Sequence, residues 1–231
     1  MTGLPTDAEG LLRLLRARGI RLAARGRSLD VDAPAGALTD ELIDAMRRLK
    51  PGLLALLADE ARGVVRSAPA SVNQVRQFHL TNASDAPQTF TVALRFALRG
   101  KLDHSTLQQA LTALVARHPA LRTRYAVKYD ELVQQVLAPA PVDLPVVDVP
   151  AHRLDHMVHA WAALPFALDE EPSFRALLAR VYGGPSADGD RHELVVAMHH
   201  GVVDGWSTEI LVRDLGALYR AALPGEPAGL P

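Results

Sequence analysis

Histidine, aspartate and glycine are concentrated in the segment MHHGVVDGWS, residues 198 to 207. His199 and His200 are adjacent, and Asp204 follows four positions after His200 with Gly205 directly behind it. A histidine on a rigid support can take and return a proton near neutral pH, because its ordinary pKa is about 6.5. The glycines make a regular helix here doubtful, so the pattern alone leaves three readings open: a catalytic site, a structural hydrogen-bonded cluster and a metal site.

The surrounding sequence predicts that the histidines lie at the end of a buried strand. The run HELVVAMHH, residues 192 to 200, is apolar up to the histidines, and the glycines mark the turn before a helix near 206 to 222. A mixed α and β segment begins near Ser71. Within it we expect strands at 90–100, 121–127, 131–137, 174–182 and 192–198, and helices from Asp103 to His118 and near 152–163.

The first 60 residues predict a small separate unit in the order helix, hairpin, helix, helix. Thr6 and Glu9 fit a capping box, and Gly19 fits the end of the helix that follows. Thr39 and Pro51 are suited to open the second and third helices. Residues 61 to 70 lose periodicity and predict a linker.

The predicted hairpin at 20–32 would leave at least one strand edge open to a strand from a partner. Six arginines and no acidic residue lie between Arg13 and Arg27, which favours an acidic peptide at short range. A solvated surface without a partner is the alternative reading of the same charges.

Composition excludes several classes of protein. The 231 residues carry a net charge of -1, so no overall attraction to nucleic acid or to anionic membranes is expected. The absence of cysteine excludes disulfides, thiolate catalysis and Cys-ligated zinc. With no signal peptide and no apolar run of about 18 residues, the sequence predicts a cytoplasmic protein.

Four blocks of sequence carry a resemblance to a known family. MHHGVVDGWS closely resembles the HHxxxDG signature of nonribosomal peptide synthetase condensation domains. SVNQVRQFHL (71 to 80) and ARHPALRTRY (116 to 125) resemble the family's first and second motifs, and PFALDEEPSFRALLAR (165 to 180) resembles the segment after them. The departures from the motifs are Asn73, Gln77, Pro119 and Tyr125. In the N-terminal 60 residues, RARGIRL, APAGALTDEL and LLALLAD resemble the TubC-type docking domain.

This resemblance implies an α+β fold in two parts. Residues 1–60 would form the αββαα docking domain, and 61–70 the linker. Residues 71–231 would form the N-terminal lobe of a condensation domain, one lobe of a chloramphenicol-acetyltransferase-like α/β sandwich. The later family motifs are not in this chain, so we expect it to lack the C-terminal lobe and to be inactive alone.

The resemblance also assigns roles to the residues of the signature. His200 would be the catalytic histidine, which assists removal of the amine proton, and an amide near Gly205 would stabilise the oxyanion. Asp204 would hold the loop by pairing with an arginine, with Arg76 as a candidate. His199 and Trp206 would be structural, the tryptophan packing under the loop.

The implied partners are carrier proteins and another synthetase subunit. Upstream and downstream carriers would present the acyl donor and the aminoacyl acceptor on phosphopantetheine arms, with no bound cofactor or metal in this chain. A short, acidic C-terminal tail of the upstream subunit would add a strand to the hairpin; homodimerisation of the docking unit stays open. The expected tail contacts are Ile20, Arg21, Leu22, Arg25, Arg27, Leu29 and Val31.

Alternatives are a binding module only, or an ester-forming acyltransferase with the same signature. Two further patterns resemble functional motifs, but a structural explanation is favoured for each. His152, His156 and His159 could face one way on a helix, but three helical histidines without evident supporting groups indicate a surface stripe rather than zinc. YGGPS, residues 182 to 186, resembles the GGxS of carrier proteins, but its flanking strands favour a hairpin loop.

Overall fold

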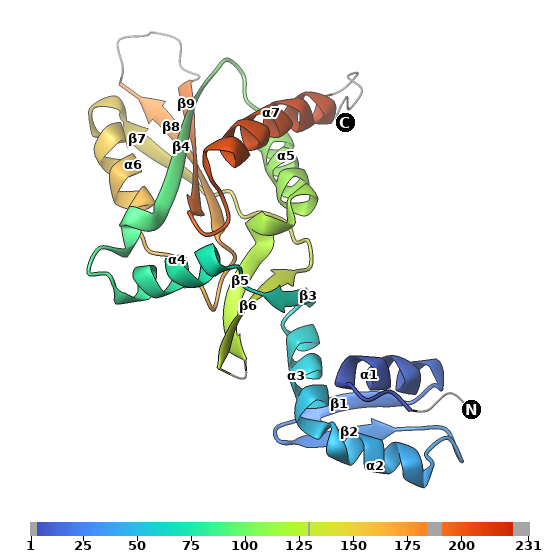
Figure 1. The fold of residues 1–231 in the computed structure, drawn as a ribbon. Coiled ribbons are helices and arrows are strands. Elements are labelled where there is room, and N and C mark those ends of the chain that lie inside the picture. The colour runs from blue at the N-terminus through green and yellow to red at the C-terminus, as the bar shows by residue number, and fades with distance from the viewer. Residues whose placement is uncertain (1–3, 129, 184–190, 224–231) are drawn as a thin grey trace. The chain divides into compact units, whose positions relative to one another are not determined.

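The computed structural model describes residues 4–128, 130–183 and 191–223, and it divides the chain into two compact units, 1–65 and 66–231 (Figure 1). The division falls inside the predicted linker, but that segment is not irregular. It holds the end of helix α3 (Lys50–Ala61) and strand β3 (Val64–Pro69). Most side chains of β3 are exposed, so the strand leaves no alternation of apolar residues in the sequence.

The first unit has the predicted αββαα order. Its remaining elements are α1 (Ala8–Ala17), β1 (Arg21–Arg25), β2 (Ser28–Asp32) and α2 (Asp40–Arg48). Asp7, not Thr6, caps α1, because its carboxylate accepts a hydrogen bond from the Gly10 amide at 2.7 Å. Thr39 caps α2 as predicted.

The second unit contains two sheets and their covering helices. Its elements after β3 are α4 (Val72–Ala83), η1 (Pro87–Phe90), β4 (Thr91–Arg99), α5 (His104–Arg117), η2 (Pro119–Arg122), β5 (Thr123–Lys128), β6 (Glu131–Leu137), β7 (Val146–Pro150), η3 (Ala151–Arg153), α6 (Leu154–Ala162), β8 (Phe174–Tyr182), β9 (Arg191–His199) and α7 (Gly205–Ala222). One sheet has the strand order β3-β6-β5 and the other β4-β9-β8-β7.

The four-stranded sheet sets the position of the two histidines. Strand β9 pairs antiparallel with both β4 and β8, and β8 pairs in parallel with β7. Thr91 lies opposite His199, so β9 ends where β4 begins. Because β9 is paired with a strand on each side, the backbone of its last residues is held in place.

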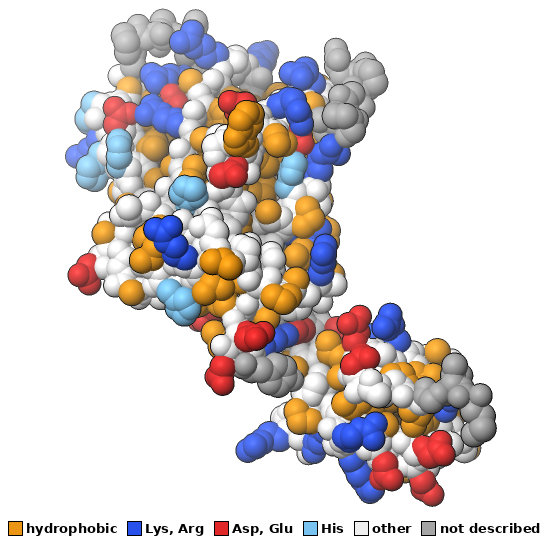
Figure 2. Space-filling view, in the orientation of Figure 1, with side chains coloured by type: hydrophobic (Ala, Val, Ile, Leu, Met, Phe, Trp, Pro, Cys, Tyr) orange, Lys and Arg blue, Asp and Glu red, His pale blue; other side chains and the backbone are white. Residues whose placement is uncertain are grey.

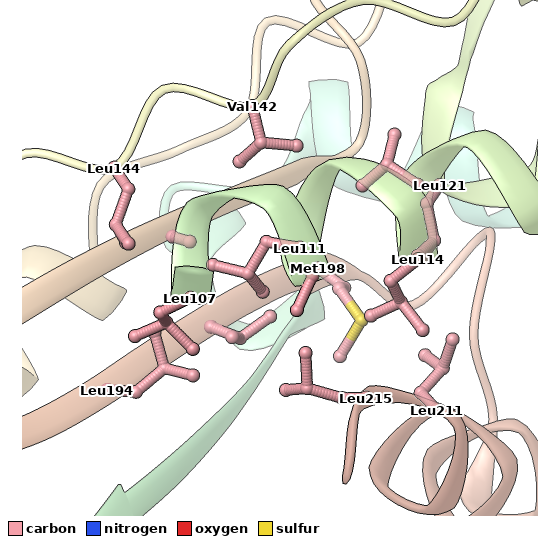
Figure 3. Packing of buried hydrophobic residues seen from close by; sticks show 14 of the residues in the cluster. Leu107, Leu111, Leu114, Leu121, Val142, Leu144, Leu194, Met198, Leu211 and Leu215 are labelled. Atoms are coloured by element: carbon pink, nitrogen blue, oxygen red, sulfur yellow. The ribbon is translucent and has the colours of Figure 1, made fainter. Parts of the chain in front are cut away.

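The main core lies between this sheet and helices α5 and α7, which lie side by side on one face (Figure 1). Leu194 and Met198 of β9 point to that face and pack against leucines of both helices (Figure 3). Val195 points to the opposite face and packs with residues of α6. Both faces of β9 are therefore covered, and alternate residues face different helices.

Candidate active site

His199 is the last residue of β9 and is buried, with 1% of its surface exposed. Its Nδ1 accepts a hydrogen bond from the Gly201 amide at 3.0 Å, and its Nε2 lies 2.9 Å from the Thr81 hydroxyl of α4. The Thr81 hydroxyl in turn lies 2.8 Å from the Gln77 carbonyl, to which it donates.

These contacts define one set of proton positions. A carbonyl can only accept, so Thr81 donates to Gln77 and must accept from His199. The Nε2 atom of His199 therefore carries the proton, while Nδ1 is the acceptor for Gly201. A neutral imidazole satisfies every partner, whereas a protonated one would place two N–H groups against each other at Nδ1.

The surroundings of His199 agree with a neutral ring. Burial, and then the nearby His200, lowers the pKa of His199 to about 4. The rings of Phe90 and Phe166 flank it, each with its centroid 6.4 Å away. At neutral pH the His199 ring is therefore uncharged, with both nitrogens in contact with protein groups.

His200 has the opposite environment. Its backbone amide donates to the Phe90 carbonyl at 2.8 Å, which extends the pairing of β9 with the segment before β4. Its side chain is exposed. The backbone of His200 is thus fixed by the sheet while the imidazole stays accessible, the combination that general acid-base chemistry requires.

Gly201 is needed at its position because its surroundings leave no room for a side chain. A Cβ atom there would lie 2.9 Å from the Tyr125 hydroxyl and 3.0 Å from His199 Nδ1. Tyr125 itself donates to the Gly201 carbonyl at 3.1 Å. Burial raises the pKa of Tyr125 to about 12, so this hydroxyl stays protonated and remains a donor.

Asp204 and Gly205 form the start of α7. The Asp204 carboxylate accepts from the Ser207 amide at 2.8 Å and from the Ser207 hydroxyl at 2.6 Å, which makes it the N-cap. These hydrogen bonds, and more weakly the charge of His200, lower the pKa of Asp204. The amide of Gly205 is at the first helical position, where amides have no intrahelical acceptor.

Two of the predicted supporting residues lie elsewhere than expected. Trp206 does not pack under the loop: it is 80% exposed, on the side of α7 away from the core. Arg76 is exposed on α4. Among the described residues no ion pair joins it to Asp204, whose carboxylate bonds to Ser207 instead.

The sequence did not predict that Thr81 contacts His199 or that Tyr125 contacts Gly201. Tyr125 was visible only as a departure from the second motif. The same motif contributes Arg117 and His118, which lie 3.1 and 2.9 Å from the carboxylate of Asp214 on α7. Asp214 is 1% exposed and also accepts from Arg213, so the motif fastens α5 to the helix that follows the histidines.

The β1–β2 hairpin in the first unit has one apolar and one charged face. The pairs Leu22–Val31 and Ala24–Leu29 share one face, and Leu22 and Leu29 pack on the core. On the other face Arg21 lies opposite Asp32, and Arg25 forms an ion pair with Asp30 at 2.9 Å. Arginine charge here is therefore balanced by acidic residues, and Figure 2 shows both signs interspersed on the visible face of this unit.

Ile20 is not available to a docking peptide. It is fully buried in the core of the first unit, so the prediction that it contacts a peptide is wrong. Its amide donates to the Leu15 carbonyl at 2.9 Å and the Gly19 amide donates to Arg16 at 3.0 Å, the two bonds of a Schellman motif. In that motif the residue after the glycine packs against the helix that it ends.

No group of three or more candidate metal ligands occurs in the described part of the chain, which includes His152, His156 and His159. Residues 184–186 of the YGGPS segment lie outside the described residues. Among the helices that the structure describes, none is long and apolar enough to cross a membrane.

Comparisons with known proteins agree with this geometry. The condensation domain profile matches residues 64–231, and the TubC N-terminal docking domain profile matches residues 9–59. Chondramide synthase cmdD of Chondromyces crocatus is 34% identical over 173 residues, which are 70% of this chain and 4% of that protein. The chain thus spans a small part of the curated relatives that it matches.

Solved structures show the same fold. The starter condensation domain of the rhizomide synthetase RzmA matches 72% of this chain and 40% of its own, with a TM-score of 0.63 and 19% identity. The EpoB cyclization-docking bidomain of Sorangium cellulosum matches 95% of this chain and 45% of its own, with a TM-score of 0.55 and 23% identity.

Proposed function

This chain belongs to the condensation domain family of nonribosomal peptide synthetases, and from this premise we propose that its second unit forms amide bonds with His200 as the catalytic histidine. The observation that carries the proposal is the difference between the two adjacent histidines. His199 has both ring nitrogens engaged and is neutral, while His200 has a fixed backbone and an exposed ring.

The proposed reaction joins two thioesters carried on phosphopantetheine arms. The amine of the acceptor attacks the donor carbonyl, a C–N bond forms, and the C–S bond breaks to release the donor carrier's thiol. His200 takes the amine proton and returns it to the departing sulfur, or positions the amine, since orientation can supply much of the rate. The free amides at the start of α7, beginning with Gly205, face the developing negative charge.

The test is product formation by a polypeptide that contains this chain and a complete condensation domain. Loaded carrier proteins would be mixed with it and the amide product measured by mass spectrometry. We expect His200→Ala to abolish product, while His156→Ala, an exposed histidine of α6, leaves it unchanged. Full activity of His200→Ala would overturn the assignment, and an ester product from a hydroxyl acceptor would favour the ester-forming alternative.

We further propose that the chain by itself is inactive as an acyltransferase, because it corresponds to 40% of the condensation domain structure of the rhizomide synthetase. In the family that the sequence resembles, the active site lies between two lobes, and both are needed to hold two carrier arms. Amide formation by this chain alone, at a rate near that of the complete domain, would contradict this proposal.

A second function is supported by the hairpin. Strands β1 and β2 pair only with each other, so within the described residues each has an outer edge without a strand partner. The tail of an upstream synthetase subunit would add there as a third strand, next to Arg21 and Arg25 if it joins β1 and next to Asp30 and Asp32 if it joins β2. An acidic tail therefore belongs on β1.

Titration of this chain with C-terminal peptides of candidate upstream subunits, followed by NMR, tests the docking function. We expect saturable binding of one acidic peptide, with a dissociation constant in the micromolar range, weakened by salt and by Arg21→Glu. The matched control is His200→Ala, which should not change binding. Binding of the acidic peptide that Asp32→Arg strengthens and Arg21→Glu leaves unchanged would place the tail on β2 instead.

A further inference from the structure

The four-stranded sheet has an open edge near the site. Strand β7 begins opposite Leu178, so the first residues of β8, from Phe174 to Ala176, have β9 on one side and no strand from the described residues on the other. A cavity of about 360 Å³ lies beside this edge. That volume is within the range of about 300–1,000 Å³ that small-molecule sites occupy.

The walls of the cavity are mainly apolar. They come from the end of α5, the segment between β6 and β7, the end of α6 and the start of β8. The larger apolar side chains are Val115, Leu121, Leu137, Val142, Trp161 and Phe174. Figure 3 shows two of them, Leu121 and Val142, at the rim of the main core beside α5.

Two arginines supply positive charge to this apolar space. Arg122 and Arg175 both line the cavity, and the Nε atom of each is buried without a hydrogen-bond partner. Neither forms an ion pair with any residue that the structure describes. Among the described residues that line the cavity, the acidic one is Asp143, which is exposed to solvent, and outside the lining Glu171 interacts electrostatically with Arg175.

Both guanidinium groups donate hydrogen bonds to backbone carbonyls of the protein. Arg175 donates to the carbonyls of Leu164 and Pro165 after α6, and it lies 4.3 Å over the ring of Phe166. Arg122 donates to the Leu137 carbonyl at the end of β6. Both terminal nitrogens of Arg175 and one of Arg122 are bonded to the protein, which limits the orientations of the two groups.

The unpaired edge of β8 also presents backbone N–H and C=O groups beside the cavity. The Leu178 amide donates to the Pro145 carbonyl, so it points away from β9. Residues two and four positions before it, Ala176 and Phe174, present their N–H and C=O groups to the same side. An anion here would satisfy the arginine N–H groups, and an apolar body would fill the remaining space.

We propose that this cavity binds a small carboxylate with an apolar body, such as an aryl- or branched-chain carboxylic acid. The carboxylate lies against Arg122 and Arg175, and the apolar part lies against Trp161 and Phe174. The proposal is independent of the amide-forming function, since none of these residues belongs to the histidine segment.

The fluorescence of Trp161 tests the proposal directly. The chain has two tryptophans, so Trp206→Phe, at an exposed position, leaves Trp161 as the reporter. The probe is 3-phenylpropionate, and its neutral control is 3-phenylpropionamide, which has nearly the same shape. We expect a saturable change with the carboxylate and at least tenfold weaker binding of the amide.

Two variants locate the site. Ala140→Phe places a ring at an exposed position of the cavity wall, without a change of charge, and should abolish binding. Arg122→Gln should weaken binding tenfold or more, while Arg99→Gln, an exposed arginine outside the cavity, should have no effect. Equal binding of acid and amide, no saturable change, or unaltered binding by Ala140→Phe would each overturn the proposal.

Discussion

Acid should destabilise the second unit in a pH range set by His199. The folded state keeps this ring neutral with a pKa of about 4, whereas the unfolded chain has the ordinary value of 6.5. Between these two values the unfolded state binds more protons than the folded state, so stability falls as the pH falls. The contribution of His199 to the unfolding free energy is fully present above pH 6.5.

The magnitude follows from the size of the pKa shift. At pH 4.5 the linkage relation predicts that about 2–3 kcal/mol of unfolding free energy is lost through His199 alone. The acidic groups with lowered pKa values, Glu193 and Asp214, act in a lower range, because their stabilisation is present above their ordinary values of 4.5 and 3.8. The range from pH 6.5 to 4.5 is therefore the one to measure.

Urea unfolding followed by tryptophan fluorescence is the assay. Trp161 and Trp206 are both in the second unit, so the signal does not report on residues 1–65. We expect the unfolding free energy of the unmodified chain to fall between pH 7.5 and 4.5 by about 2–3 kcal/mol more than that of His199→Gln.

Parallel pH curves for the two proteins would refute the reasoning. If His199→Gln does not fold, NMR titration of the His199 ring in the unmodified chain gives the same information. The ring should show no protonation above about pH 5, and titration near 6.5 would mean that the ring is not held in its neutral form.

Three other substitutions test the supports of the site. Gly201→Ala should lower the unfolding free energy by about 1–3 kcal/mol in urea titrations, since its Cβ meets the Tyr125 hydroxyl, and adding Tyr125→Phe should recover part of the loss. Asp214→Asn should lower it by about 1–3 kcal/mol, because it weakens the bonds from α5; an unchanged melting temperature would count against this role. Asp204→Ala should lower the melting temperature of the second unit by removing the cap of α7, whereas Asp204→Ser should retain most of it.

Several elements were predictable because their local signals agree with their tertiary context. The predicted strands 131–137 and 174–182 match β6 and β8 in their limits, since both combine apolar residues with clear turn signals. Helix α5 begins at its predicted cap, Asp103. The family resemblance assigned different roles to His199 and His200, whereas the burial of one ring and the exposure of the other are seen only in the structure.

Other features had no local signal. Helix α4 buries only Thr81 among its residues, so no apolar stripe indicated a helix there, although Ser71 and Gln74 form a capping box. Thr81 is 118 positions from His199 in sequence, and a pairing over that distance cannot be read from spacing. Trp206 precedes the core residue Leu211 by five positions, about 140° around a helix, and this rotation turns it to solvent.

The pairing of β4 with β9 has a consequence for synthesis of the protein. Thr91 meets His199 and Arg99 meets Arg191, so strands made about 100 residues apart must find each other. Translation at about 5–20 residues per second would expose β4 for roughly 5–20 s before its partner exists. During that time its apolar face, which includes Leu94 and Phe96, is uncovered and its backbone edge toward β9 is unpaired, so a chaperone or another nascent chain can bind the strand.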